Sequence, residues 1–148
     1  MNTAVPNWIP WDASGRTGPE QLARLERLLG RIGPGPRILV THYPICRDSG
    51  RSERRSRGLR DLTRLVDVAS RGGVCLWLHG HRHGSYHHAN PGQAPFPVIC
   101  AGSATQRGCW SYRNYTIEGS HFTALRREFD PAGGAFRDAG TFALELPV

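Results

Sequence analysis

Residues 74–83 read VCLWLHGHRH, an apolar run that opens into a loop with histidines at positions 79, 81 and 83. Residues two apart in an extended segment point the same way, so His81 and His83 are expected to present their imidazoles to one small volume. Neutral imidazole is the commonest protein metal ligand near neutral pH. Gly80 gives the backbone conformations that a side chain would forbid. The stretch therefore predicts a buried strand followed by a metal-binding loop.

A second stretch, ILVTHYP at residues 38–44, follows the same plan, with His42 directly after a short apolar run. Continuous apolar runs are typical of strands buried on both faces in parallel sheets. Between the two stretches, apolar residues from Leu59 to Ala69 recur with a helical period, and Gly72-Gly73 ends that helix. Strand, helix and strand at this spacing predict a parallel β-α-β unit with a right-handed crossover. His42 and the histidine loop are thereby expected at one edge of the sheet, where open α/β sheets place their ligands.

The chain before the first strand predicts an irregular segment and one helix. Residues 1–16 are expected to be irregular structure pinned by Trp8 and Trp11. Residues 17–20 have the form of a capping box, with Thr17 as the cap and Glu20 bonding back to it. The leucines that follow predict an amphipathic helix over residues 18–30.

The chain after residue 84 predicts β structure. Two short strands are expected, then a hairpin with a short turn, then a last strand. Their expected ranges are 85–88, 97–101, 112–118, 121–129 and 141–146. The length of 148 residues suits a single domain, residues 1–148, of the α/β class.

The composition is basic, with a net charge of +7, and the sequence contains no lysine. Many of the arginines fall between Arg47 and Arg71, a patch that favours anionic partners in general. The four cysteines form no C-x-x-C pair and are expected to be buried free thiols. No run approaches the roughly 20 apolar residues of a membrane span, and residues 1–10 lack the features of a signal peptide. We therefore expect a cytoplasmic protein without a membrane partner.

Three motifs together resemble the calcineurin-like metallophosphoesterase family. They are VTHYP at 40–44, LHGHRH at 78–83 and AGSAT at 101–105, and their order after strands resembles that of the family's C-terminal half. The resemblance implies the C-terminal part of a β-sandwich flanked by helices (α/β/β/α), incomplete in this chain. It also implies two divalent metal ions (Mn, Fe or Zn), with His42 and His81 on one ion and His83 on the other. His79 would either hold the metal ligands in position without binding the metal or pack structurally. Arg47 and Arg82 would guide substrate.

The sequence departs from the family in its N-terminal motifs. D-x-H, G-D-x-x-D and G-N-H-[DE], which carry the bridging and terminal carboxylates, are absent. The chain is therefore expected to be a C-terminal fragment, a product of a mis-called start or a degenerate relative. A homodimer or a separate N-terminal half is the expected partner. Apolar residues left without their neighbours are expected to be partly exposed, namely Trp8, Trp11, Leu22, Leu25 and Leu29.

Three functions remain open from the sequence. The first is hydrolysis of a phosphomonoester or phosphodiester by a metal-activated hydroxide. The second is a degenerate, non-catalytic fold that binds one metal or none. The third is nucleic-acid binding through the Arg47–Arg71 patch, which is not expected because no aromatic stacking platform accompanies the charge. Residues 47–57 are predicted to form a mobile loop over the strand edge.

Overall fold

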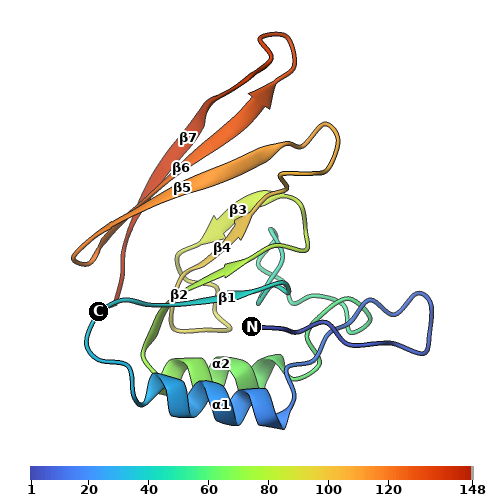
Figure 1. Ribbon diagram of the computed structural model, residues 1–148, viewed down its shortest axis with the longest axis vertical. Coiled ribbons are helices and arrows are strands. Elements are labelled where there is room, and N and C mark those ends of the chain that lie inside the picture. The colour runs from blue at the N-terminus through green and yellow to red at the C-terminus, as the bar shows by residue number, and fades with distance from the viewer. Residues whose placement is uncertain (148) are drawn as a thin grey trace.

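The computed structural model describes residues 1–147, which form a mixed α/β fold of two helices and two sheets (Figure 1). The first sheet has the strand order β1-β2-β4-β3, and the second has the order β5-β6-β7. Strands β1, β2 and β4 are parallel, whereas β3 is antiparallel to β4. The bounds are β1 (Arg37–Thr41), β2 (Val74–His79), β3 (Ser85–His88), β4 (Val98–Ala101), β5 (Ser111–Glu118), β6 (His121–Asp130) and β7 (Ala135–Glu145).

The predicted β-α-β unit is confirmed. Strands β1 and β2 pair in parallel, with Thr41 opposite His79, and helix α2 (Leu62–Arg71) connects them. The helix begins three residues later than Leu59, the first residue of the predicted period. It ends at the predicted glycines, and a Cβ at Gly72 would collide with the Leu29 side chain. Only glycine therefore lets the end of α2 approach the helix before it.

One face of the first sheet is covered by the two helices. Helix α1 (Pro19–Leu29) lies beside α2 under the sheet (Figure 1). Trp77 of β2 is fully buried at the centre of this layer and stacks on Phe96 with ring centroids 6.1 Å apart. Leu22, Leu25 and Leu29 are buried here, so the prediction of their partial exposure is wrong. The reason is that α2 and the sheet cover the apolar stripe of α1 within this chain.

The second sheet covers the other face of β2 and β4. Leu76 and Ile99 pack there against Phe122 and Ala124 of β6. The predicted hairpin of β5 and β6 is confirmed, and β7 is longer than the strand predicted near residues 141–146. Apart from Phe136, its first residues are polar or small and mostly exposed, so no apolar pattern marked them.

Strand β1 lies at the edge of its sheet and is not buried on both faces as predicted. Ile38 is 37% exposed and Val40 is 54% exposed, whereas Leu39 between them is buried against the helices. The second sheet packs over β2 and β4, and its cluster contains no residue of β1. The apolar run of β1 therefore has one unpartnered face, beside an edge that no strand within residues 1–147 extends.

The predicted capping box is absent. Thr17 and Glu20 do not bond to each other's backbone, and the Thr17 hydroxyl is buried without a partner. The Asp61 carboxylate instead accepts hydrogen bonds from the backbone N–H groups of Thr17 (2.9 Å) and Gly18 (2.8 Å). The α1 N-terminus is thus held by a residue 43 positions away from Gly18, which local sequence could not reveal.

The predicted irregular segment is confirmed for residues 1–16, but aromatic packing does not hold it in place. Trp8 and Trp11 are exposed, while polar side chains form the contacts. The cysteine prediction is confirmed for Cys46, Cys75 and Cys100 and wrong for Cys109, which is exposed. Among residues 1–147, no helix is long and apolar enough to cross a membrane.

Replacing Asp61 with alanine is expected to lower the free energy of unfolding by about 2 kcal/mol, because two backbone N–H groups lose a charged acceptor. Urea denaturation measures the change. Glu20→Ala is the matched control, since Glu20 lies exposed in the first turn of α1 and should cost less than about 1 kcal/mol. Equal losses for the two variants would contradict the role assigned to Asp61.

Candidate metal centre

His42 and His81 meet at the carboxyl ends of β1 and β2. His42 follows β1 directly, and His81 lies two residues after β2. Nε2 of His42 and Nδ1 of His81 are 3.0 Å apart, although 39 positions separate the residues in sequence. The backbone N–H of Gly80 also donates to the His42 carbonyl at 3.2 Å, which joins the two strand ends. The parallel pairing therefore brings together two of the three histidines that the sequence singled out.

The histidine loop has an unusual backbone. His81 (φ 65°) and His83 (φ 57°) are the only non-glycine residues with positive φ within residues 1–147. The left-handed region is unfavourable for residues with a Cβ, and such strain is concentrated at functional sites. The extended arrangement predicted for this loop is therefore wrong. As a result His81 and His83 do not face one volume.

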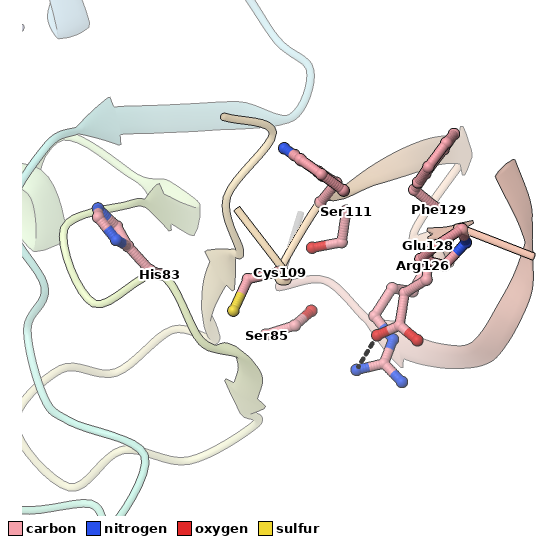
Figure 2. A pocket seen from close by; sticks show the side chains of 10 residues that line it. His83, Ser85, Cys109, Ser111, Arg126, Glu128 and Phe129 are labelled. Atoms are coloured by element: carbon pink, nitrogen blue, oxygen red, sulfur yellow. Dashed lines mark ion pairs between the residues drawn. The ribbon is translucent and has the colours of Figure 1, made fainter. Parts of the chain in front are cut away.

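His83 lies apart from the other two histidines. Its Nδ1 contacts the side-chain oxygen of Gln106, and its ring borders a separate cavity of about 320 Å³. Figure 2 shows this cavity, with His83 at one side and Ser85, Cys109 and Ser111 nearer its centre. The opposite wall carries the ion pair between Arg126 and Glu128, at 3.3 Å. The pair His42–His81 and His83 thus border different cavities, although His83 is close enough to lower the pKa of His42.

His79 is buried beneath the loop. Its Nδ1 contacts the Gly80 carbonyl at 3.1 Å, and its Nε2 is buried without a partner. The ring also lies 5.5 Å from that of Tyr86, centroid to centroid. It bonds to neither His42 nor His81, so its contacts are those of a packing residue.

Of the two arginines expected to guide substrate, Arg82 has a side-chain partner, whereas the contacts of Arg47 are made by its backbone. Arg82 forms an ion pair with Glu53 at 3.3 Å, and the Glu53 side chain is only 4% exposed. The carbonyl of Arg47 contacts Nε2 of His88 at 3.0 Å, while Nε of Arg47 is buried without a partner. These contacts, with backbone bonds such as Arg47 N–H to the Arg51 carbonyl at 2.8 Å, hold the loop that was predicted to be mobile.

A buried hydrogen-bond relay fixes the position of His42. Nε1 of Trp77 donates to Oγ1 of Thr41 at 2.9 Å, and that hydroxyl donates to the Tyr43 carbonyl at 2.8 Å. Thr41 and Tyr43 flank His42, so the relay clamps the backbone on both sides of it. Trp77 and Thr41 are both buried, which leaves no water to take the place of a missing partner.

Burial favours the neutral form of His42, His79 and His81. Partial burial lowers the pKa of both His42 and His81, and the neighbouring imidazoles lower it further. Burial lowers the pKa of His79 to about 4. A neutral imidazole keeps a lone pair on one ring nitrogen, which is the form that binds metals.

The geometry fits two ligands of one ion. Two nitrogens that each lie about 2.1 Å from an ion are about 3.0 Å apart at the right angle of an octahedral site and about 3.4 Å apart at the angle of a tetrahedral site. The separation of 3.0 Å between His42 and His81 matches the octahedral spacing and is also the length of a hydrogen bond between the two rings. Within residues 1–147, however, no group of three or more His, Cys, Asp and Glu side chains is arranged to hold an ion. The described residues therefore do not fit the full ligand set of a two-ion centre.

Sequence reasoning missed three residues that shape the site. Glu53 anchors the loop of residues 47–57 to Arg82. The sequence feature that could have marked Glu53 is that it is an acidic residue in an arginine-rich stretch. Gln106 holds His83, and Thr41 belongs to the relay. Neither of these two carries a sequence signal, because each acts through a contact across the fold.

Replacing Thr41 with valine is expected to lower the free energy of unfolding by about 1–3 kcal/mol, because Nε1 of Trp77 loses its acceptor in a buried position. The same variant should weaken Zn²⁺ binding by loosening His42. Thr41→Ser keeps the hydroxyl and is the matched control. Urea denaturation and calorimetric Zn²⁺ titration measure the two effects, and a valine variant that behaves like the serine variant would contradict the relay.

Comparison with known proteins assigns no family. No protein-family model matches the chain, and no curated protein matches it. The activity of the chain is therefore inferred from its own residues.

Proposed function

We propose that this chain is the histidine-bearing part of a metal-dependent phosphoesterase that resembles the calcineurin-like family. The reaction is hydrolysis of a phosphomonoester or phosphodiester. The observation that carries the proposal is the His42–His81 pair, in which two neutral imidazoles from the ends of adjacent parallel strands stand 3.0 Å apart.

The arrangement of the layers supports the proposal. Two helices cover one face of a mostly parallel sheet, and a second sheet covers the other face (Figure 1). A sandwich of two sheets with helices outside is the fold that the resemblance implies, and the chain has one of the two helical layers. The incomplete sandwich is consistent with the unpartnered face of β1 at Ile38 and Val40.

The left-handed backbone of His81 and His83 is the second support. Each such residue costs about 1–2 kcal/mol, which the surrounding structure must offset. In the proposed site this backbone places the His81 ring beside His42 and the His83 ring beside Gln106.

The roles of the residues follow from their contacts. Nε2 of His42 and Nδ1 of His81 would hold one divalent ion, and Thr41 and Trp77 keep His42 in place. The ion would supply Lewis-acid chemistry there, which polarises phosphate oxygens and makes bound water more acidic. Carboxylates for a two-ion centre would come from a second copy of the chain or from a separate N-terminal half. The rival function is a non-catalytic fold that binds one ion or none.

We expect His81→Ala to reduce metal retention after equilibration with Mn²⁺ or Zn²⁺ and desalting, because one of two imidazole ligands is removed. Elemental analysis measures metal per chain. His121→Ala is the matched control, since His121 lies exposed at the start of β6 and bonds to Glu145.

Hydrolysis of p-nitrophenyl phosphate and bis-p-nitrophenyl phosphate is measured on the same samples. Metal-stimulated hydrolysis that disappears in His81→Ala supports the phosphoesterase. Metal binding without hydrolysis favours the non-catalytic fold. A wild-type chain that retains no metal would contradict both the site and the proposed function.

A further inference from the structure

The loop of residues 7–12 presents two tryptophans to solvent. Trp8 is 103% exposed and Trp11 is 78% exposed, and Ile9 between them is 47% exposed. Figure 1 shows the N-terminal segment, in dark blue, reaching away from the helices and the sheets. Indole rings are among the largest apolar side chains, and folding usually buries most of their surface. Two exposed rings on one short loop therefore indicate a surface that contacts a ligand.

Hydrogen bonds and an ion pair fix this loop, so the exposure of the two indole rings does not result from a flexible segment. The side-chain amide of Asn7 donates to the carbonyls of Asp12 (2.7 Å) and Ser14 (2.8 Å). Arg60 forms an ion pair with Asp12 at 2.9 Å, and the Asp12 N–H closes a turn onto the Ile9 carbonyl at 3.0 Å. The tip is thus presented from a fixed base.

Unpaired arginines lie beside the base of this loop. The Ala13 N–H donates to the Ser56 carbonyl at 2.8 Å, which joins the loop to residues 51–57. Four arginines of that segment are exposed, and none of them forms an ion pair within residues 1–147. They are Arg51, Arg54, Arg55 and Arg57. Guanidinium groups that are free of carboxylates are available for phosphate oxygens.

The tryptophan loop borders the histidine pair. A cavity of about 350 Å³ is lined on one side by Asn7, Ile9 and Pro10 and on the other by His42 and His81. The arginine segment is tied to the histidine loop as well, through the ion pair between Glu53 and Arg82. The backbone of the tryptophan loop thus adjoins both the cavity of the imidazole pair and, through the bond from Ala13 to Ser56, the arginine segment.

We propose that this region binds the phosphates and bases of a single-stranded nucleic acid or nucleotide. Trp8 and Trp11 stack on bases, the four arginines contact phosphates, and the cavity brings one phosphate toward His42 and His81. Aromatic rings and a basic groove are the two components of sequence-tolerant single-strand binding. Cleavage of the bound ligand rests on the proposed phosphoesterase function, whereas binding does not.

The sequence argument against nucleic acid is thereby removed. It relied on the absence of an aromatic platform beside the Arg47–Arg71 patch, and Trp8 and Trp11 supply one across the bond from Ala13 to Ser56. Single strands are favoured over duplex because stacking on a protein ring needs bases that are free of their own stack. An anionic lipid surface could also attract tryptophan and arginine, but it would not use the adjoining cavity.

Fluorescence anisotropy with a labelled single-stranded oligonucleotide tests the proposal. The double variant Trp8→Ala, Trp11→Ala is expected to bind about tenfold or more weakly, because each stacked base contributes on the order of 1–3 kcal/mol. Tyr112→Ala is the matched control, since Tyr112 is an exposed aromatic residue on β5 of the second sheet. It should bind like the wild type.

The salt dependence separates stacking from phosphate binding. The tryptophan variant should keep the slope of log affinity against log salt concentration. The double variant Arg54→Gln, Arg55→Gln should reduce that slope by about 0.7 for each phosphate that the protein no longer neutralises. Competition with AMP distinguishes the two ligand sources: equal affinity indicates a nucleotide, and tighter oligonucleotide binding indicates a strand.

Three outcomes would overturn the proposal. They are unchanged oligonucleotide binding in the tryptophan variant, equal weakening in Tyr112→Ala, and wild-type binding to vesicles of mixed phosphatidylcholine and phosphatidylserine without binding to oligonucleotide or AMP. His121→Ala, at an exposed residue at the start of β6, is measured alongside and should retain binding. A wild-type chain that holds no metal yet binds the oligonucleotide through its tryptophans supports this inference while it contradicts the phosphoesterase.

Discussion

The parallel pairing of β1 with β2 is the constraint on which the rest of the structure depends. A parallel pair cannot be closed by a tight turn, so the chain must cross over the sheet, and α2 is that crossover. The crossover returns the chain to the same end of the sheet, which places His42 and His81 side by side. The helices then bury the face that holds Trp77, and Trp77 in turn holds the strand end through Thr41. The end of β1 therefore carries both a hydrogen bond to the buried core and a candidate metal ligand.

The sequence predicts this part of the fold well because its signals are local. Apolar runs, a helical period and paired glycines marked β1, α2 and β2 within a few residues. It predicts poorly wherever a distant residue decides the outcome. Asp61 caps α1 in place of the predicted capping box, and a neighbouring sheet that stops short of β1 leaves Val40 exposed.

The same difference between local signals and contacts of distant residues applies to the candidate site. The sequence pattern marked His42 and His81, and the strand topology placed them together. It could not show that His81 and His83 take a left-handed backbone, because an H-x-H motif is equally compatible with an extended chain. It predicts that Trp8 and Trp11 are partly exposed, but it could not show how their loop is held, since the hydrogen bonds of Arg60 join residues far apart in sequence. Side-chain direction depends on these contacts and not on residue type.

The left-handed histidines also set a limit on how the protein can be made more robust. Glycine at position 81 or 83 would relieve the backbone and favour folding by about 1 kcal/mol. It would also remove the imidazole that the strained turn presents. Stabilising substitutions chosen from backbone geometry alone would select these two positions early and would remove two candidate metal ligands first. The two residues with the most strained backbone are therefore the ones to keep unchanged.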